Sequence, residues 1–257
     1  TYPLSKRQSG FLIPTVGYNN RFGMHVQESF FWAINPSQDL TVSPFYYSKL
    51  GYGSDFKYRY VLDKQSRGQW LVTALQQTEL PDVAGVDPKG QDAQQTRALI
   101  TGTHTQQFTP DLFVRAKAFY VTDSSLLQQL SNSGVARAAP SVESNLLANQ
   151  RLAYGNTYLL GQYLLPLQSG GSDTFQRLPE VGYSLPNSSL FNSPILLGAD
   201  TSFVNFYREQ GFTQNRIDIL PGLSTDVLNF GHTVGLTPQV KVRETYYTRG
   251  VQDSESQ

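Results

Sequence analysis

Residues 55–62 have the sequence DFKYRYVL, in which polar and apolar side chains alternate. Successive side chains of a β-strand point to opposite faces of a sheet, so the segment predicts a strand with one apolar and one charged face. The apolar face would carry Phe56, Tyr58, Tyr60 and Leu62, and the charged face Asp55, Lys57 and Arg59. Such a strand suits a sheet that has lipid on one side and water on the other.

The same alternation recurs along the chain. Arg115 and Lys117 alternate with apolar positions in residues 112–120, and Lys241 and Arg243 do so in residues 240–246. Several runs reach the length of about 9–11 residues that a tilted transmembrane strand needs. The pattern predicts an all-β, antiparallel fold, and it favours part of a transmembrane β-barrel with roughly a dozen strands. The other expected strands are 9–17, 23–34, 39–48, 67–78, 97–106, 136–146, 149–155, 157–167, 175–185, 196–208 and 217–224.

Composition agrees with a membrane barrel but does not require one. Aromatic residues make up 12% of the chain and charged residues only 16%, whereas about 25% charged residues is usual. A barrel with an apolar outer face and a polar lumen has this composition. A soluble extracellular β-sandwich, an adhesin or a β-helix has a similar one, so these alternatives remain open.

Several classes of protein are excluded or disfavoured. The 20 basic and 20 acidic residues balance, so no overall basic charge indicates nucleic-acid binding, and the absence of cysteine excludes thiol chemistry. The longest apolar run, residues 30–34, is far short of the roughly 20 residues of a membrane helix. His25, His104 and His232 have no metal-ligand spacing, and no nucleotide or hydrolase motif occurs. We therefore expect that the protein is not an enzyme and that it has no catalytic residue, metal or cofactor.

Turn sequences suggest short connections on one side of the sheet and longer ones on the other. Asn19–Arg21 and Asn35–Asp39 are compact turn sequences, whereas residues 81–92 are long and polar. This asymmetry is usual for barrels of the bacterial outer membrane. Residues 123–130 predict one short helix, and we find no internal domain boundary in residues 1–257.

Three segments in the first 62 residues carry a family resemblance. Lys6–Pro14 (KRQSGFLIP), Phe31–Pro44 (FWAINPSQDLTVSP) and Gly51–Tyr60 (GYGSDFKYRY) match, in order and spacing, the opening strands of a known barrel. The chain thereby resembles the lipopolysaccharide-assembly family known as LptD, over roughly the first half of that family's barrel. Ser29 stands where the family often has a proline, which suggests that the second strand is weakened less here.

The resemblance implies transport rather than catalysis. Such proteins lie in the bacterial outer membrane and receive lipopolysaccharide from a periplasmic lipid-bridge protein through an N-terminal domain. They pass the lipid into the outer leaflet through a lateral seam between the first and last strands, and a lipoprotein plugs the barrel. The gate strand of that seam would contain Gly10, Phe11, Leu12, Ile13 and Pro14.

Six cations are candidates for the wall of the lumen. Either they meet the anionic head group of a glycolipid, or they only hydrate the wall. They are Lys57, Arg59, Arg115, Lys117, Lys241 and Arg243. Another kind of barrel, such as a porin or adhesin, would carry similar residues.

Pro14 allows two interpretations. Proline has no N–H to give to a neighbouring strand. In the first interpretation, Pro14 ends the first strand or lies in a bulge. In the second, it weakens the pairing of the first strand with the last. Because large barrels of this type reach about 26 strands, we also expect residues 1–257 to be an incomplete barrel.

Overall fold

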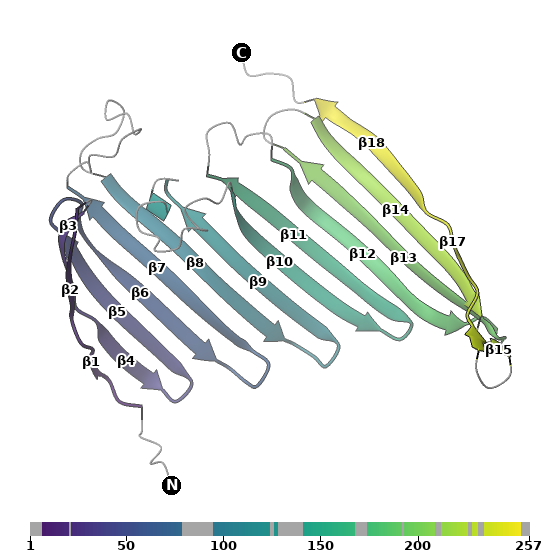
Figure 1. Ribbon diagram of the computed structural model, residues 1–257, viewed down its shortest axis with the longest axis horizontal. Helices are drawn as coiled ribbons and strands as arrows, with labels where there is room; N and C mark the ends of the chain where they lie inside the picture. The colour runs from purple at the N-terminus through teal and green to yellow at the C-terminus, as the bar shows by residue number, and fades with distance from the viewer. Residues whose placement is uncertain are drawn as a thin grey trace, which may run out of the picture. The chain divides into compact units, whose positions relative to one another are not determined.

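A computed structural model describes residues 7–20, 22–78, 95–123, 126–127, 141–167, 174–191, 193–208, 212–225, 228–230 and 234–252. Within these ranges the chain is almost entirely β-structure (Figure 1). Sixteen of the described strands belong to one sheet, and two others form a separate hairpin. The printed pairings are antiparallel, so the prediction of an all-β antiparallel fold is confirmed, and the sheet is consistent with part of a barrel.

The chain divides into two compact units. The first consists of residues 1–106 and 117–142, and the second of residues 107–116 and 143–257. Strands of the first unit are β1 Gly10–Phe11, β2 Thr15–Asn19, β3 Gly23–Gln27, β4 Phe30–Asn35, β5 Gln38–Tyr47, β6 Gly51–Val61, β7 Arg67–Gln77 and β8 Gln95–Gln107. β9, Leu112–Val121, has residues in both units.

The second unit contains the remaining strands. They are β10 Ser141–Leu152, β11 Gly155–Pro166, β12 Gln176–Ser189, β13 Ile195–Tyr207, β14 Phe212–Thr225, β15 Leu228–Phe230, β16 Val234–Leu236, β17 Gln239–Lys241 and β18 Glu244–Gln252. Most strands pair with their neighbours in the sequence. The exceptions lie at the ends of the strand order, where β3 and β4 both pair with β5, and β17 and β18 both pair with β14.

The strands of the first unit separate apolar from polar side chains. Their registers align one apolar residue from each of six strands in a single row across the sheet. That row is Phe11, Phe30, Val42, Phe56, Val72 and Ile100. Lys57 and Arg59 lie on the opposite face, so the alternation expected at residues 55–61 is confirmed. Leu62 is an exception, because it lies in the turn after β6 and bonds Ser66 there.

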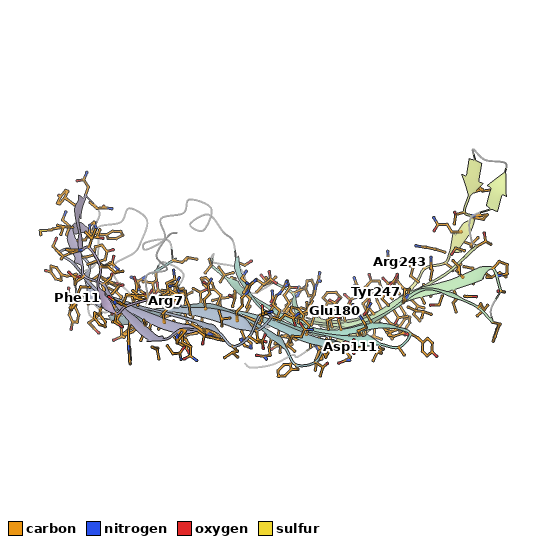
Figure 2. All side chains as sticks on the ribbon, turned by 90° about the horizontal axis from the view of Figure 1, so that it is seen from below. Arg7, Phe11, Asp111, Glu180, Arg243 and Tyr247 are labelled. Atoms are coloured by element: carbon orange, nitrogen blue, oxygen red, sulfur yellow. The ribbon has the colours of Figure 1, made fainter. Side chains whose placement is uncertain are left out.

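An equivalent apolar row crosses the second unit. Adjacent strands align Leu159, Val181, Phe203, Ile217 and Tyr246. All five are at least 37% exposed, so no part of the described protein covers this row. Figure 2 shows side chains on both faces of the strands, as expected for a sheet without a covering layer.

Four of the predicted strand boundaries are wrong. Residues 9–17 form β1 and β2 rather than one strand, residues 23–34 form β3 and β4, and residues 240–246 divide between β17 and β18. Conversely, residues 141–152 form the single strand β10, because no turn-forming residue separates 146 from 149. Residues 136–140 lie outside the described ranges.

Connections differ in length within the first unit. There, β4–β5 and β6–β7 are joined by short turns, whereas 17 residues separate β7 from β8. The long segment predicted at residues 81–92 falls in that connection and outside the described ranges. Of the helix predicted at 123–130, only Asp123, Leu126 and Leu127 are described, and both leucines are buried.

Among the described residues, no helix has the length and apolar character needed to cross a membrane.

Candidate functional site

The first strand is held by very few backbone contacts. Gly10 and Phe11 form β1 and pair with Phe31 and Phe30 of β4. The Leu12 N–H donates to the Ser29 carbonyl at 2.8 Å, and the strand then stops until β2 begins at Thr15. Of the five predicted gate residues, two are therefore in β1. The other three, Leu12, Ile13 and Pro14, lie in the gap, and the Ile13 side chain is 91% exposed.

Pro14 explains one side of this gap. It has no N–H to give to a neighbouring strand, and it restricts the conformation of the residue before it. The first of the two interpretations, in which Pro14 interrupts the strand, agrees with the structure. Its effect on pairing with a last strand is untested and remains a prediction.

A second interruption, between β3 and β4, has its cause in the partner strand. The Glu28 N–H donates to the Pro44 carbonyl at 3.2 Å, but Pro44 has no N–H to return the bond. The ladder therefore breaks at Glu28 and Ser29, although Ser29 is not itself a proline. Across the gap, the Ser29 and Ser43 hydroxyls bond each other at 2.8 Å.

The same arrangement recurs at the other end of the strand order. The Val242 N–H donates to the Pro221 carbonyl at 3.1 Å, and Pro221 has no N–H to return the bond. The break between β17 and β18 lies at this point, while the register on β14 stays the same on both sides of it. Pro44 and Pro221 were not among the predicted site residues, although each stands in a recognisable strand sequence.

We expect Pro44→Ala to join β3 and β4. The new N–H would face the Glu28 carbonyl and complete the missing pair, which should stabilise the edge hairpin by about 1 kcal/mol. Hydrogen exchange of the backbone amides in residues 23–35 would measure it. The matched control is Pro36→Ala, in an exposed turn, which should leave exchange in this segment unchanged. Equal exchange in Pro44→Ala and the unaltered protein would show that the break has another cause.

A charged cluster lies beside the edge on the polar face. The Asp39 side chain is only 3% exposed and forms ion pairs with Arg7, which precedes β1, and with Arg59 of β6. The Arg59 Nε donates to Asp39 at 2.8 Å. One buried carboxylate thus holds two half-exposed guanidinium groups.

The predicted lumen cations are divided between the two units. Lys57 and Arg59 share the polar face of β6, and Arg115 and Lys117 are exposed on one side of β9. In the second unit, Lys241 packs over Gly222, and Arg243 pairs with Asp218 of β14. The surroundings of these cations therefore differ: five lie in strands, and Arg243 lies between β17 and β18.

Sequence reasoning selected the cations and missed the acids that accompany them. Asp39 and Asp218 bind predicted cations, and Glu180 accepts a bond from the Tyr158 hydroxyl at 2.8 Å. In the first unit Arg97, 4% exposed, is bidentate to Asp123 and also donates to Gln77. Only the strand register brings these groups together, so no spacing in the sequence indicates the pairs.

Aromatic side chains collect at two levels of the apolar face of the first unit. Trp32, Tyr58 and Trp70 are aligned near the β4–β5 and β6–β7 turns, and Tyr46 and Tyr52 face each other near the opposite ends of the strands. Aromatic residues gather in this way at the two interfaces of transmembrane barrels. Tyr47 and Tyr247, by contrast, lie on the polar faces, so adjacent tyrosines do not share one belt.

The turn between β6 and β7 is fixed by Asp63. Its carboxylate accepts the backbone N–H of Gln65 at 2.7 Å and that of Ser66 at 2.8 Å. These bonds, chiefly the one from Gln65, hold the pKa of Asp63 below its usual value. Their support for the turn is present above the unfolded-state pKa and is lost as the pH falls through the lowered one.

No group of three or more metal-ligating side chains occurs in the described ranges. Each unit thus offers strands with an apolar row on one face and ion pairs on the other, and each has an interrupted strand at its end of the strand order.

Comparison with known proteins identifies relatives along nearly the whole chain. Residues 95–257 match the model of a family described as LptD, LPS transport system D. The LPS-assembly protein LptD of Aromatoleum aromaticum is 26% identical over 255 residues, which cover 96% of this chain and 30% of that protein. That of Shewanella frigidimarina is 24% identical over 261 residues, covering 100% of this chain and 32% of that protein.

A third relative, the LPS-assembly protein LptD of Methylococcus capsulatus, is 27% identical over 94% of this chain and 22% of its own length. The chain thus spans between about a fifth and a third of these relatives. The family model matches well over half of the chain, and the alignment with the Shewanella frigidimarina relative covers all of it. On these grounds, the chain belongs to the LptD family.

Proposed function

We propose that this chain forms part of a bacterial outer-membrane translocon barrel that inserts lipopolysaccharide into the outer leaflet through a lateral seam. Membership of the LptD family supports this, because the relatives are named LPS-assembly proteins. The activity is transport, with lipopolysaccharide as the transported molecule rather than a substrate that is chemically changed.

The two faces of the sheet support a position in the membrane. Apolar rows on one face would contact outer-membrane lipid, and the polar face would line a lumen. Tyr60 lies on the apolar face of β6 beside the aromatic level of Tyr58, with the two ring centroids 5.4 Å apart. Tyr52 and Tyr60 are about 27 Å apart along β6, and a strand tilt of about 40° reduces this to about 21 Å in height. This is close to the apolar band of about 25 Å in transmembrane barrels.

The observation that best supports a lateral seam here is the short backbone pairing of the first strand. β1 has two paired residues, and Leu12, Ile13 and Pro14 follow without forming a strand. An edge with so few ladder bonds separates at low cost, since each bond contributes only about 1 kcal/mol net. Gly10–Pro14 is accordingly the proposed gate segment.

The polar face would carry the head group and sugar chain. Lys57, Arg59, Arg115, Lys117, Lys241 and Arg243 are the proposed lumen cations. The plug lipoprotein would contact the same lumen, and the periplasmic lipid-bridge protein would deliver lipid through an N-terminal domain. A porin or adhesin barrel and a soluble β-structure are the alternatives. Heat-modifiable gel migration of the full-length protein distinguishes a barrel from a soluble fold, and lipopolysaccharide binding distinguishes the translocon from other barrels.

Locking the seam tests the proposal. A covalent crosslink between residues 9–17 and the last strand of the full-length protein should stop delivery of lipopolysaccharide to the surface. The control is the same two residues substituted but not crosslinked, which should support normal delivery. Normal delivery by the locked protein would show that lipid leaves elsewhere.

Pro14→Ala tests the gate segment more gently. It adds an N–H that can extend the pairing of β1, which should slow delivery by up to about tenfold. Surface lipopolysaccharide would be measured over time, with folding and lipoprotein binding as controls. Unchanged delivery together with slower hydrogen exchange at residues 10–15 would show that Pro14 does not limit the seam.

A further inference from the structure

The three sequence segments that define the start of this sheet meet in one ionic cluster. Arg7 comes from the first segment, Asp39 from the second and Arg59 from the third. The two arginines take the two carboxylate oxygens of Asp39, one each. Residues separated by 52 positions in the chain are thereby joined on the polar face, next to β1.

Arg7 is the member that reaches the edge, and it is held from three directions. Besides its ion pair with Asp39, its guanidinium lies over the Phe31 ring, 5.8 Å from the ring centroid. It also donates to the Pro36 carbonyl at 3.5 Å. Two residues further on, the Ser9 hydroxyl accepts the Ala33 N–H at 2.9 Å. Side chains thus hold the chain before β1, where no ladder is formed.

The edge needs such contacts because its backbone register is weakly defined. Two paired residues, Gly10 and Phe11, form the whole of β1. A slip by one residue would exchange the two faces of the strand and turn Phe11 away from Phe30. It would also take Arg7 from the polar face, where Asp39 and Phe31 lie.

We propose that Arg7 and Asp39 are positioning residues that clasp the N-terminal end of the edge strand to β5. Arg59 holds the Asp39 carboxylate in place, because it bonds the oxygen that Arg7 does not. The clasp fixes the register of β1 and holds its N-terminal end. The segment from Leu12 to Pro14 is then the part of the edge that separates first from the neighbouring strand. Its link to lipid delivery rests on the function proposed above, whereas the clasp itself does not.

Figure 2 labels Arg7 and Phe11, which both lie at this edge of the sheet. Phe11 pairs with Phe30 of the apolar row, whereas the Arg7 side chain contacts Phe31 and Asp39 on the polar face. Substitution at Arg7 therefore leaves the apolar row in place. This separation makes a selective test possible.

The test uses the full-length protein in its complex and measures hydrogen exchange of the amides in residues 8–14. Arg7→Gln and Asp39→Asn should each speed exchange there by about fivefold or more, because the ion pair holds the strand to β5. Arg7→Lys should restore most of the protection, since an ammonium group also pairs with Asp39. In the double variant, amides 8–14 should exchange no faster than in the faster-exchanging of the two single variants, because both changes remove the same contact.

Arg67→Gln is the matched control. Arg67 is an exposed arginine of β7 on the polar face, like Arg59 of β6, and it forms no ion pair with any residue that the structure describes. Its substitution should leave exchange at residues 8–14 unchanged. If Asp39→Asn does not fold, Arg7→Gln alone decides, because its half-exposed side chain can be lost without leaving a buried charge unpaired.

The outcomes separate the clasp from the proposed function. Unchanged exchange in Arg7→Gln would overturn the clasp. Faster exchange with altered lipid delivery would support both. Faster exchange with normal delivery would keep the clasp and count against a role of this edge in transport.

Discussion

Phe56→Arg is expected to lower the stability of the membrane-inserted protein by about 2–4 kcal/mol, the range for a cation on the lipid face near the bilayer midplane. Phe56 lies in the middle of the six-residue apolar row, between Val42 and Val72. Phe56 is 39% exposed, so the cost would come chiefly from lipid and not from a disrupted protein core.

Lys57→Gln is the control for this experiment. Lys57 is the next residue, exposed and on the opposite face, and its substitution should change stability by less than about 0.5 kcal/mol. Unfolding of the full-length protein from bilayers by denaturant would measure both. Equal tolerance at the two positions would mean that the apolar row does not face lipid.

Asp123→Ala is expected to cost about 3 kcal/mol. Arg97 is 4% exposed, and two of its nitrogens bond the Asp123 carboxylate, at 2.5 and 2.7 Å. Removing the acid takes away the carboxylate that pairs with this buried cation, which is far more costly than losing an exposed ion pair. Asp123 also accepts the Leu126 N–H at 2.9 Å, so the change should loosen the segment after β9 as well.

Asp111→Ala provides the comparison. Asp111 is an exposed residue of the β8–β9 turn, and its substitution should have little effect on the unfolding midpoint. A similar small effect for Asp123→Ala would show that water or another group compensates Arg97, and that the pair contributes little to the first unit.

The alternation of side chains allowed the sheet to be predicted from the sequence. Lys57 and Arg59 alternate with Phe56 and Tyr58 in DFKYRYVL, and a period of two has only one simple structural meaning. The apolar rows across the sheet could not be predicted in this way, because they depend on the register between neighbouring strands. The hairpin β15–β16 was not anticipated, because its three-residue strands are too short to show a period.

Interrupted strands were harder to predict, because the cause lies in a partner. Pro14 signals its own gap, but the break at Glu28 and Ser29 depends on Pro44, across the ladder. A sequence shows which residues lack an N–H, yet not which residue they fail to bond. The ionic clusters follow the same rule, since Asp39 is unremarkable in sequence until the register places it between Arg7 and Arg59.

The most direct measurement is the exposure of spin labels to lipid and to water in the full-length protein reconstituted in bilayers. Labels would replace Phe56 and Ile217 on the apolar rows, and Lys57 and Thr245 on the polar faces. Oxygen dissolved in lipid should broaden the spectra of the labels at positions 56 and 217. A water-soluble nickel complex should broaden the spectra of the labels at positions 57 and 245. If both pairs responded alike, or in the reverse sense, this sheet would not be a wall between membrane lipid and a lumen.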